Sequence, residues 1–133
     1  MTVVVWIFAL LAAMIHIVVF VWESFLIGRP SVHQGIFGVP TADVPAIRLW
    51  AFGVGFYNLS LAGGMIVGVI MWMAGNETVG RTLVTYICMF MVLGGIVLFI
   101  ADRLGFGSKR GQHIPGAVAE SVPPLVALTA ALL

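Results

Sequence analysis

Four long apolar stretches, separated by short polar segments, constrain this chain more than any other feature of its sequence. They cover about residues 3–27, 46–74, 81–101 and 117–133. About 20 apolar residues allow an α-helix to cross a bilayer, where every backbone polar group must be bonded within the protein. The pattern therefore predicts an all-α membrane protein, an antiparallel bundle of four transmembrane helices in which residues 1–133 form a single transmembrane domain.

Composition supports this class and excludes others. Hydrophobic residues make up 62% of the chain and charged residues only 8%, whereas a soluble domain carries about 25% charged residues. The net charge of +1 offers no basic face to a nucleic acid, so the expected partner is the lipid bilayer. No Lys or Arg precedes the first stretch, which we therefore interpret as a retained membrane helix rather than a cleaved signal peptide.

The positive charges are distributed unevenly between the two ends of the predicted bundle. One end carries Arg81, whereas the loops at the other end and their edges carry Arg29, Arg48, Arg103, Lys109 and Arg110. Loops rich in Lys and Arg stay in the cytoplasm. The loops over about residues 28–45 and 104–116 are therefore predicted to be cytoplasmic, with both termini extracytoplasmic, in a multi-pass protein of the inner (plasma) membrane.

A histidine and a glutamate interrupt the first apolar stretch. His16 and Glu23 are seven residues apart, which at about 100° per residue places both side chains on one face of a helix, about two turns apart. Ionisable side chains at membrane depth are costly and usually face a partner or a cavity. Each also has a structural interpretation: His16 as a neutral imidazole bonded to a neighbouring helix, and Glu23 as a protonated or interfacial carboxyl group.

Two further polar residues enter the membrane from the same predicted side as Glu23. Asn58 lies in the second stretch and Glu120 near the start of the fourth. In an antiparallel bundle, His16, Glu23, Asn58 and Glu120 are predicted to converge in the cytoplasmic half, and Tyr57 joins them only if its helix is rotated. The structural alternatives are an interhelical hydrogen bond for Asn58 and a favourable helix start for Glu120.

Two features of the predicted loops bear on this cluster. Residues 36–39, Ile-Phe-Gly-Val, are apolar for a loop and are expected to lie at the interface or against the bundle. Asp102 and Arg103, which end the third stretch, are interpreted as a solvated pair. The chain has no closely spaced pair of His and Glu residues of the kind that binds metals, so we predict no metal site, identify no cofactor and assign no catalytic residue.

Small residues form two sites at which helices can approach closely. Ser60, Gly64 and Gly68 recur every four residues in the second stretch, and Gly94 and Gly95 are adjacent in the third. Small residues at this spacing let helix backbones come close together. We favour helix packing within one chain, and dimerisation is the alternative.

Several segments together resemble a known family. They are residues 11–27 with His16 and Glu23, residues 36–39, Gly55-Phe56-Tyr57-Asn58, and residues 120–124, Glu-Ser-Val-Pro-Pro. Over almost the whole chain they resemble the small bacterial membrane family known as domain of unknown function 1304. The resemblance implies four membrane helices and no established activity. The chain departs from the family pattern at residues 53–54, where Gly-Val replaces the usual Asn-Gln, and at Glu120, where the family has Gln.

Three functional hypotheses are left open. The first, which we favour because no catalytic motif is present, is a non-catalytic protein that binds an apolar or lipid-like molecule or serves as an accessory subunit of a larger membrane-protein complex. The second is a proton-coupled small-molecule transporter that works as a homodimer through Glu23. The third is a membrane enzyme on a lipid-like substrate, with His16 and Glu23 as acid and base.

Overall fold

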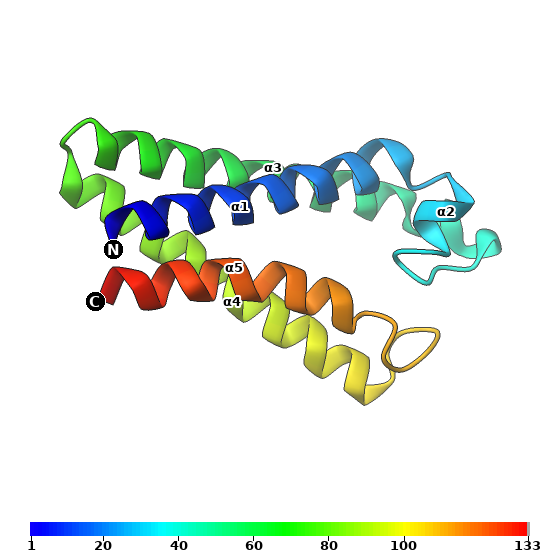
Figure 1. Cartoon of the computed structure of the whole chain (residues 1–133). Coiled ribbons are helices and arrows are strands. Elements are labelled where there is room, and N and C mark those ends of the chain that lie inside the picture. Colours follow the sequence, from blue (N-terminus) through cyan, green and yellow to red (C-terminus); the bar gives the residue numbers. More distant parts are fainter. Residues whose placement is uncertain (133) are drawn as a thin grey trace.

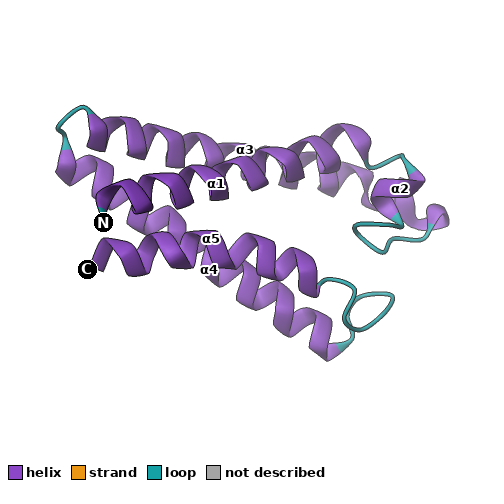
Figure 2. Ribbon diagram, in the orientation of Figure 1, coloured by secondary structure: helices purple, strands orange, loops and turns teal. Residues whose placement is uncertain are grey.

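Every regular element of the computed structural model is helical over residues 1–132, the part of the chain that it describes (Figure 2). The long helices are α1 (Thr2–Val21), extended by the π-helical turn η1 (Trp22–Leu26), α3 (Val44–Met73), α4 (Glu77–Leu104) and α5 (Ile114–Leu132). All four are long and apolar enough to cross a membrane. The predicted all-α four-helix fold is confirmed. Leu133, at which the fourth predicted stretch ends, lies outside the described residues.

The four helices form an up-and-down bundle. Helix α1 packs against α3 and α5, and α4 packs against the same two helices. Both termini lie at one end together with the α3–α4 turn, and the connections after α1 and after α4 lie at the other, the loop end (Figure 1). Toward the loop end, the α1–α3 pair diverges from the α4–α5 pair (Figure 1).

The hydrophobic core occupies the terminal half of the bundle. On α1 it consists mainly of alanines, including Ala9 and Ala13, which belong to one cluster with Met65 of α3, Met91 of α4 and Ala127 of α5. Small side chains on one helix let the larger side chains of its neighbours fill the space between the axes. The buried residues of this cluster end, toward the loop end, at Ala13 on α1, Ala62 on α3, Met91 on α4 and Ala127 on α5, and the helices diverge beyond them.

The glycines predicted for close packing face different surroundings. A Cβ atom added to Gly64 would meet Ile87 of α4, and one added to Gly68 would meet Leu83 and Val84 of the same helix. Ser60 is exposed, and its hydroxyl group donates a hydrogen bond to the carbonyl of Phe56 in its own helix. The two glycines therefore serve packing of α3 on α4 within one chain.

Helix α4 begins earlier and ends later than the stretch over residues 81–101. Its first turn is stabilised by Asn76, whose Oδ1 accepts a hydrogen bond from the backbone N–H of Val79 over 3.3 Å. At its other end Gly105 adopts a left-handed conformation with φ of 81°, which closes the helix. Asp102 therefore lies inside the last helical turn rather than in a loop.

Candidate functional site

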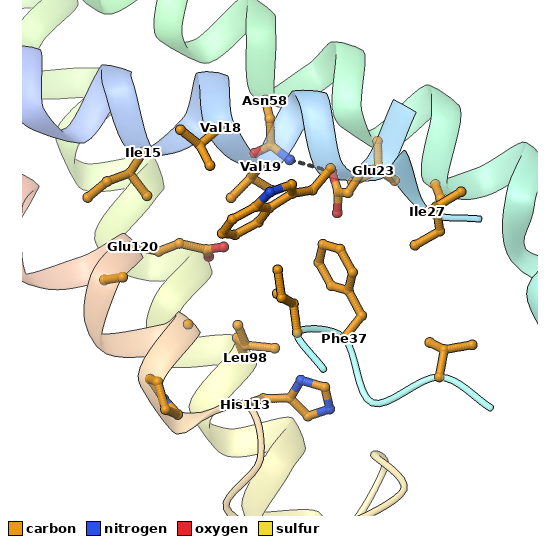
Figure 3. Close-up of a pocket in the computed structure, with 18 of the residues that line it drawn as sticks. Ile15, Val18, Val19, Glu23, Ile27, Phe37, Asn58, Leu98, His113 and Glu120 are labelled. Carbon is orange, nitrogen blue, oxygen red and sulfur yellow. Dashed lines mark hydrogen bonds between the residues drawn. The ribbon is translucent and has the colours of Figure 1, made fainter. Parts of the chain in front are cut away.

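A cavity of about 960 Å³ lies between the diverging helices at the loop end. Its walls come from α1 and η1, from α3, from α4 at Leu98 and from the start of α5, and both loops at this end contribute (Figure 3). Most of the lining is aliphatic or aromatic, as at Val19, Trp22 and Phe37. Ligand cavities in proteins have volumes of about 300–1,000 Å³ and this mainly apolar character with a few polar groups.

Glu23 reaches the cavity from the π-helical turn η1. In such a turn each N–H bonds the carbonyl five residues back, so successive residues advance through a smaller angle than in an α-helix, and turns of this kind are frequent at functional sites. Asn58 Nδ2, on α3, donates a hydrogen bond of 2.8 Å to Glu23 Oε2 (Figure 3). Both residues are half-buried and line the cavity.

A glycine on α3 allows this contact. A Cβ atom added to Gly55 would collide with Ser24 Oγ and come within 3.3 Å of Glu23 Cβ. Ser24 Oγ also donates a hydrogen bond of 3.2 Å to the carbonyl of Phe52 on α3. Close approach at Gly55 thus holds η1 against α3 and positions the carboxyl group of Glu23.

Glu120 points into the same cavity from α5, on the side facing Glu23 (Figure 3). It is half-buried. The helical walls of the cavity therefore carry one amide and two carboxyl groups among apolar side chains. Three polar groups on three different elements, all reaching one apolar space, are suited to hold the polar end of a mainly apolar molecule.

The second loop, residues 105–113, is held in place by Asp102. Its carboxyl group accepts hydrogen bonds from the backbone N–H groups of Gly111 (2.6 Å) and His113 (3.1 Å). Asp102 is only 2% exposed, so its interpretation as a solvated partner of Arg103 was wrong. The bonding pattern requires loop 105–113 to fold back onto α4, which the local sequence alone does not reveal.

The two loops at this end are bonded to each other. Ser108 Oγ donates to the carbonyl of Gly38 over 2.6 Å, and Gln112 Nε2 donates to the carbonyl of Gln34 over 3.2 Å. Residues 36, 37 and 39 line the cavity, as do Gln112 and His113. The apolar segment of the first loop thus lies against the bundle, which was one of its two expected positions.

Hydrogen bonds of a buried histidine, His33, also hold the first loop together. This loop contains the short helix α2 (Pro30–His33) and the 3-10 turn η2 (Thr41–Asp43). The buried imidazole of His33 bonds the carbonyl of Ile27 through Nδ1 (3.0 Å) and Thr41 Oγ1 through Nε2 (3.1 Å). Because a carbonyl can only accept, Nδ1 carries the proton of the first bond. His33 therefore links the end of η1 to η2, the turn directly ahead of α3.

The structure brings together Glu23, Asn58 and Glu120 of the predicted polar cluster, but not His16 or Tyr57. His16 is buried, and its Nδ1 bonds the carbonyl of Ala12 in its own helix at 3.0 Å. Met14 and Ile15 line the cavity at the same depth, so His16 differs in direction rather than in depth. Tyr57 is 73% exposed and does not line the cavity.

Sequence reasoning missed several residues of the site. Trp22, His113 and Gln112 line the cavity, and Asp102 positions the last two. The only signal for Asp102 was an acidic residue directly ahead of a glycine-rich loop. Within residues 1–132, no group of three or more His, Cys, Asp or Glu side chains is placed to hold a metal ion.

Replacing Asn58 with leucine is expected to lower the free energy of unfolding by about 1–3 kcal/mol, because Glu23 loses its hydrogen-bond donor inside the bundle. The matched control is Ser60→Ala on the same helix, since Ser60 is exposed and bonds only its own helix. Denaturation of the purified protein in detergent, followed by circular dichroism, measures both changes. Equal stability of the two variants would contradict a structural role for the Glu23–Asn58 bond.

Comparison with known protein families gives a match over most of the chain. The family model DUF1304, described as a protein of unknown function, matches residues 10–132. No curated protein and no solved structure matches the chain.

Proposed function

Because the chain belongs to the DUF1304 family of proteins of unknown function, we propose a function from the cavity itself: the protein binds an apolar, lipid-like molecule within the membrane and does not transform it. The observation that carries this proposal is the cavity of about 960 Å³, apolar over most of its lining, with Glu23, Asn58 and Glu120 on its walls. Its size is that of a site for a drug-sized or lipid-like molecule.

The position of His16 argues against the enzymatic alternative. General acid–base catalysis needs both groups within hydrogen-bonding reach of the substrate, directly or through one water molecule. Glu23 lines the cavity, but His16 is buried beside Ala12 and does not reach it. A transporter that uses Glu23 would share the cavity, but no separate observation favours it over binding alone.

The membrane setting of this function is also a proposal. Four helices of sufficient length and hydropathy support a multi-pass membrane protein. The excess of Lys and Arg at the loop end supports a cytoplasmic position for that end, hence for the cavity, and an inner-membrane location. A second copy of the chain or a larger membrane-protein complex is the protein partner that we propose for it.

Filling the cavity with a bulky side chain tests the proposed function. Ala119 on α5 lines the cavity, whereas its neighbour Val118 does not. We expect the wild type and Val118→Trp to retain an apolar molecule when the protein is extracted with its surrounding lipid and examined by native mass spectrometry. Ala119→Trp is expected to lose that molecule, because an indole ring occupies its place.

The controls for this experiment are fold and ligand identity. All three proteins should show the same helical circular dichroism, and the retained molecule is identified by solvent extraction and mass spectrometry. Retention of no apolar molecule by the wild type, or equal retention by Ala119→Trp, would rule out binding in this cavity.

A further inference from the structure

The charged side chains that line the cavity are acidic. Glu23 and Glu120 line it, and among the described lining residues none is Lys or Arg. The basic residues of the adjacent loop, Lys109 and Arg110, are exposed, and the Arg110 guanidinium lies near Gly105 rather than in the cavity lining. An anionic head group, such as a carboxylate or a phosphate, would thus meet two carboxyl groups without a compensating lysine or arginine.

The hydrogen-bonding capacity left open on Glu23, Asn58 and Glu120 is mainly that of acceptors, whereas Trp22 and His113 contribute ring N–H donors elsewhere on the lining. Asn58 Nδ2 donates to Glu23 Oε2, which leaves Glu23 Oε1 and Asn58 Oδ1 available. Within the described residues, the Glu120 carboxyl group has no hydrogen bond to another side chain or to the backbone. These three groups come from η1, α3 and α5, so they can surround one head group rather than lie in a row.

A protonated amine complements this arrangement. An alkylammonium group has up to three N–H donors and no acceptor, the complement of one amide and two carboxyl oxygens. Carboxylates repel each other in an apolar space and are costly to bury alone, and a cation bonded to both removes that cost. A neutral alcohol can donate only one of these bonds, and an anion none.

We propose that the cavity recognises a single-chain amphiphile with a protonated amine head, which lies between Glu23 and Glu120 while its hydrocarbon chain runs along the apolar wall at Val19, Trp22 and Phe37. This inference rests on the proposed function and specifies its ligand class. The head group is held by charge-assisted hydrogen bonds, which are about twice as strong as those between neutral groups. The chain contributes affinity through burial of its methylene groups, which does not depend on the head group.

Three probes with the same hydrocarbon chain separate the head group from the chain: dodecylammonium, dodecanol and dodecanoate. Each is added to the purified protein in lipid nanodiscs, and the dissociation constant is obtained from the ligand-dependent rise of the unfolding midpoint. Dodecylammonium is expected to bind at least about tenfold more tightly than dodecanol, and dodecanoate more weakly than either. Native mass spectrometry checks that one probe molecule binds per chain.

Carboxamide variants test the head-group contacts. Glu23→Gln and Glu120→Gln keep the shape of each side chain, and glutamine still accepts the bond from Asn58. Each is expected to weaken dodecylammonium binding about tenfold and to leave dodecanol binding nearly unchanged. The matched control is Glu77→Gln, which removes an equal charge at the opposite end, where Glu77 is exposed and lies 3.4 Å from Arg81.

The outcomes distinguish this inference from the proposed function. Equal binding of all three probes, or tightest binding of dodecanoate, would overturn the amine assignment while leaving an apolar binding site in place. Unchanged dodecylammonium affinity in both cavity variants would also overturn it. Binding of none of the probes would count against the proposed function as well.

Discussion

Gly95→Ala is expected to destabilise the bundle by about 1–3 kcal/mol, the usual cost of overpacking a close contact. A Cβ atom at Gly95 would collide with the hydroxyl group of Ser121 and lie 2.8 Å from the carbonyl oxygen of Ala117, both on α5. A backbone carbonyl cannot move aside as a flexible side chain can, so α4 and α5 would have to separate. Denaturant titration in detergent measures the change in unfolding free energy.

The adjacent glycine supplies the control. A Cβ atom at Gly94 would meet nothing within 4 Å, and alanine is favoured over glycine within a helix by up to about 1 kcal/mol. Gly94→Ala is therefore expected to be neutral or slightly stabilising. If the two variants were equally stable, α4 and α5 could not approach each other at Gly95 as described.

Asp102→Ala is expected to release the second loop and to weaken binding in the cavity. Its carboxyl group is the acceptor for the N–H groups of Gly111 and His113, and a buried donor that loses its acceptor is costly. Hydrogen exchange should show both amides exchanging at least about tenfold faster than in the wild type. Apolar ligand binding should fall in the same variant, because His113 and Gln112 line the cavity.

The control for this substitution is Asp43→Ala. Asp43 is an exposed carboxylate at the start of α3, and its side chain makes no capping hydrogen bond. We expect unchanged exchange at Gly111 and His113 in this variant. Wild-type protection of those two amides in Asp102→Ala would show that another group holds the loop.

The fold was predictable from sequence because its main determinant is local. Stretches of apolar residues long enough to span a bilayer leave few alternatives to helices. The approximate depth of Glu23, Asn58 and Glu120 followed from counting residues along antiparallel helices, and these three side chains do line one cavity. Depth can be counted from the helix ends, so this part of the arrangement required no knowledge of packing.

Rotation about the helix axis was much harder to predict. His16 and Glu23 share a face if the helix is regular, yet only Glu23 reaches the cavity, because η1 changes the angle per residue and α1 presents a different set of side chains to the open space. Tyr57 lies beside Asn58 but points to the exterior. The prediction that Asp102 is solvated was wrong because the N–H groups of Gly111 and His113 reach its carboxyl group only when the loop folds back onto α4.

The π-helical turn at Trp22–Leu26 also predicts how the first helix of a related protein can differ in length. A turn of this kind holds one residue more than an α-helical register needs, so loss of a single residue there would restore a regular helix. Because the wider turn already accommodates the extra residue, the helix upstream and Ile27 downstream would keep nearly their present positions, and only the side chains inside the turn would change direction. In a relative with an uninterrupted first helix, we therefore expect a one-residue gap within this turn, a preserved bundle, and a carboxyl group that no longer meets Asn58.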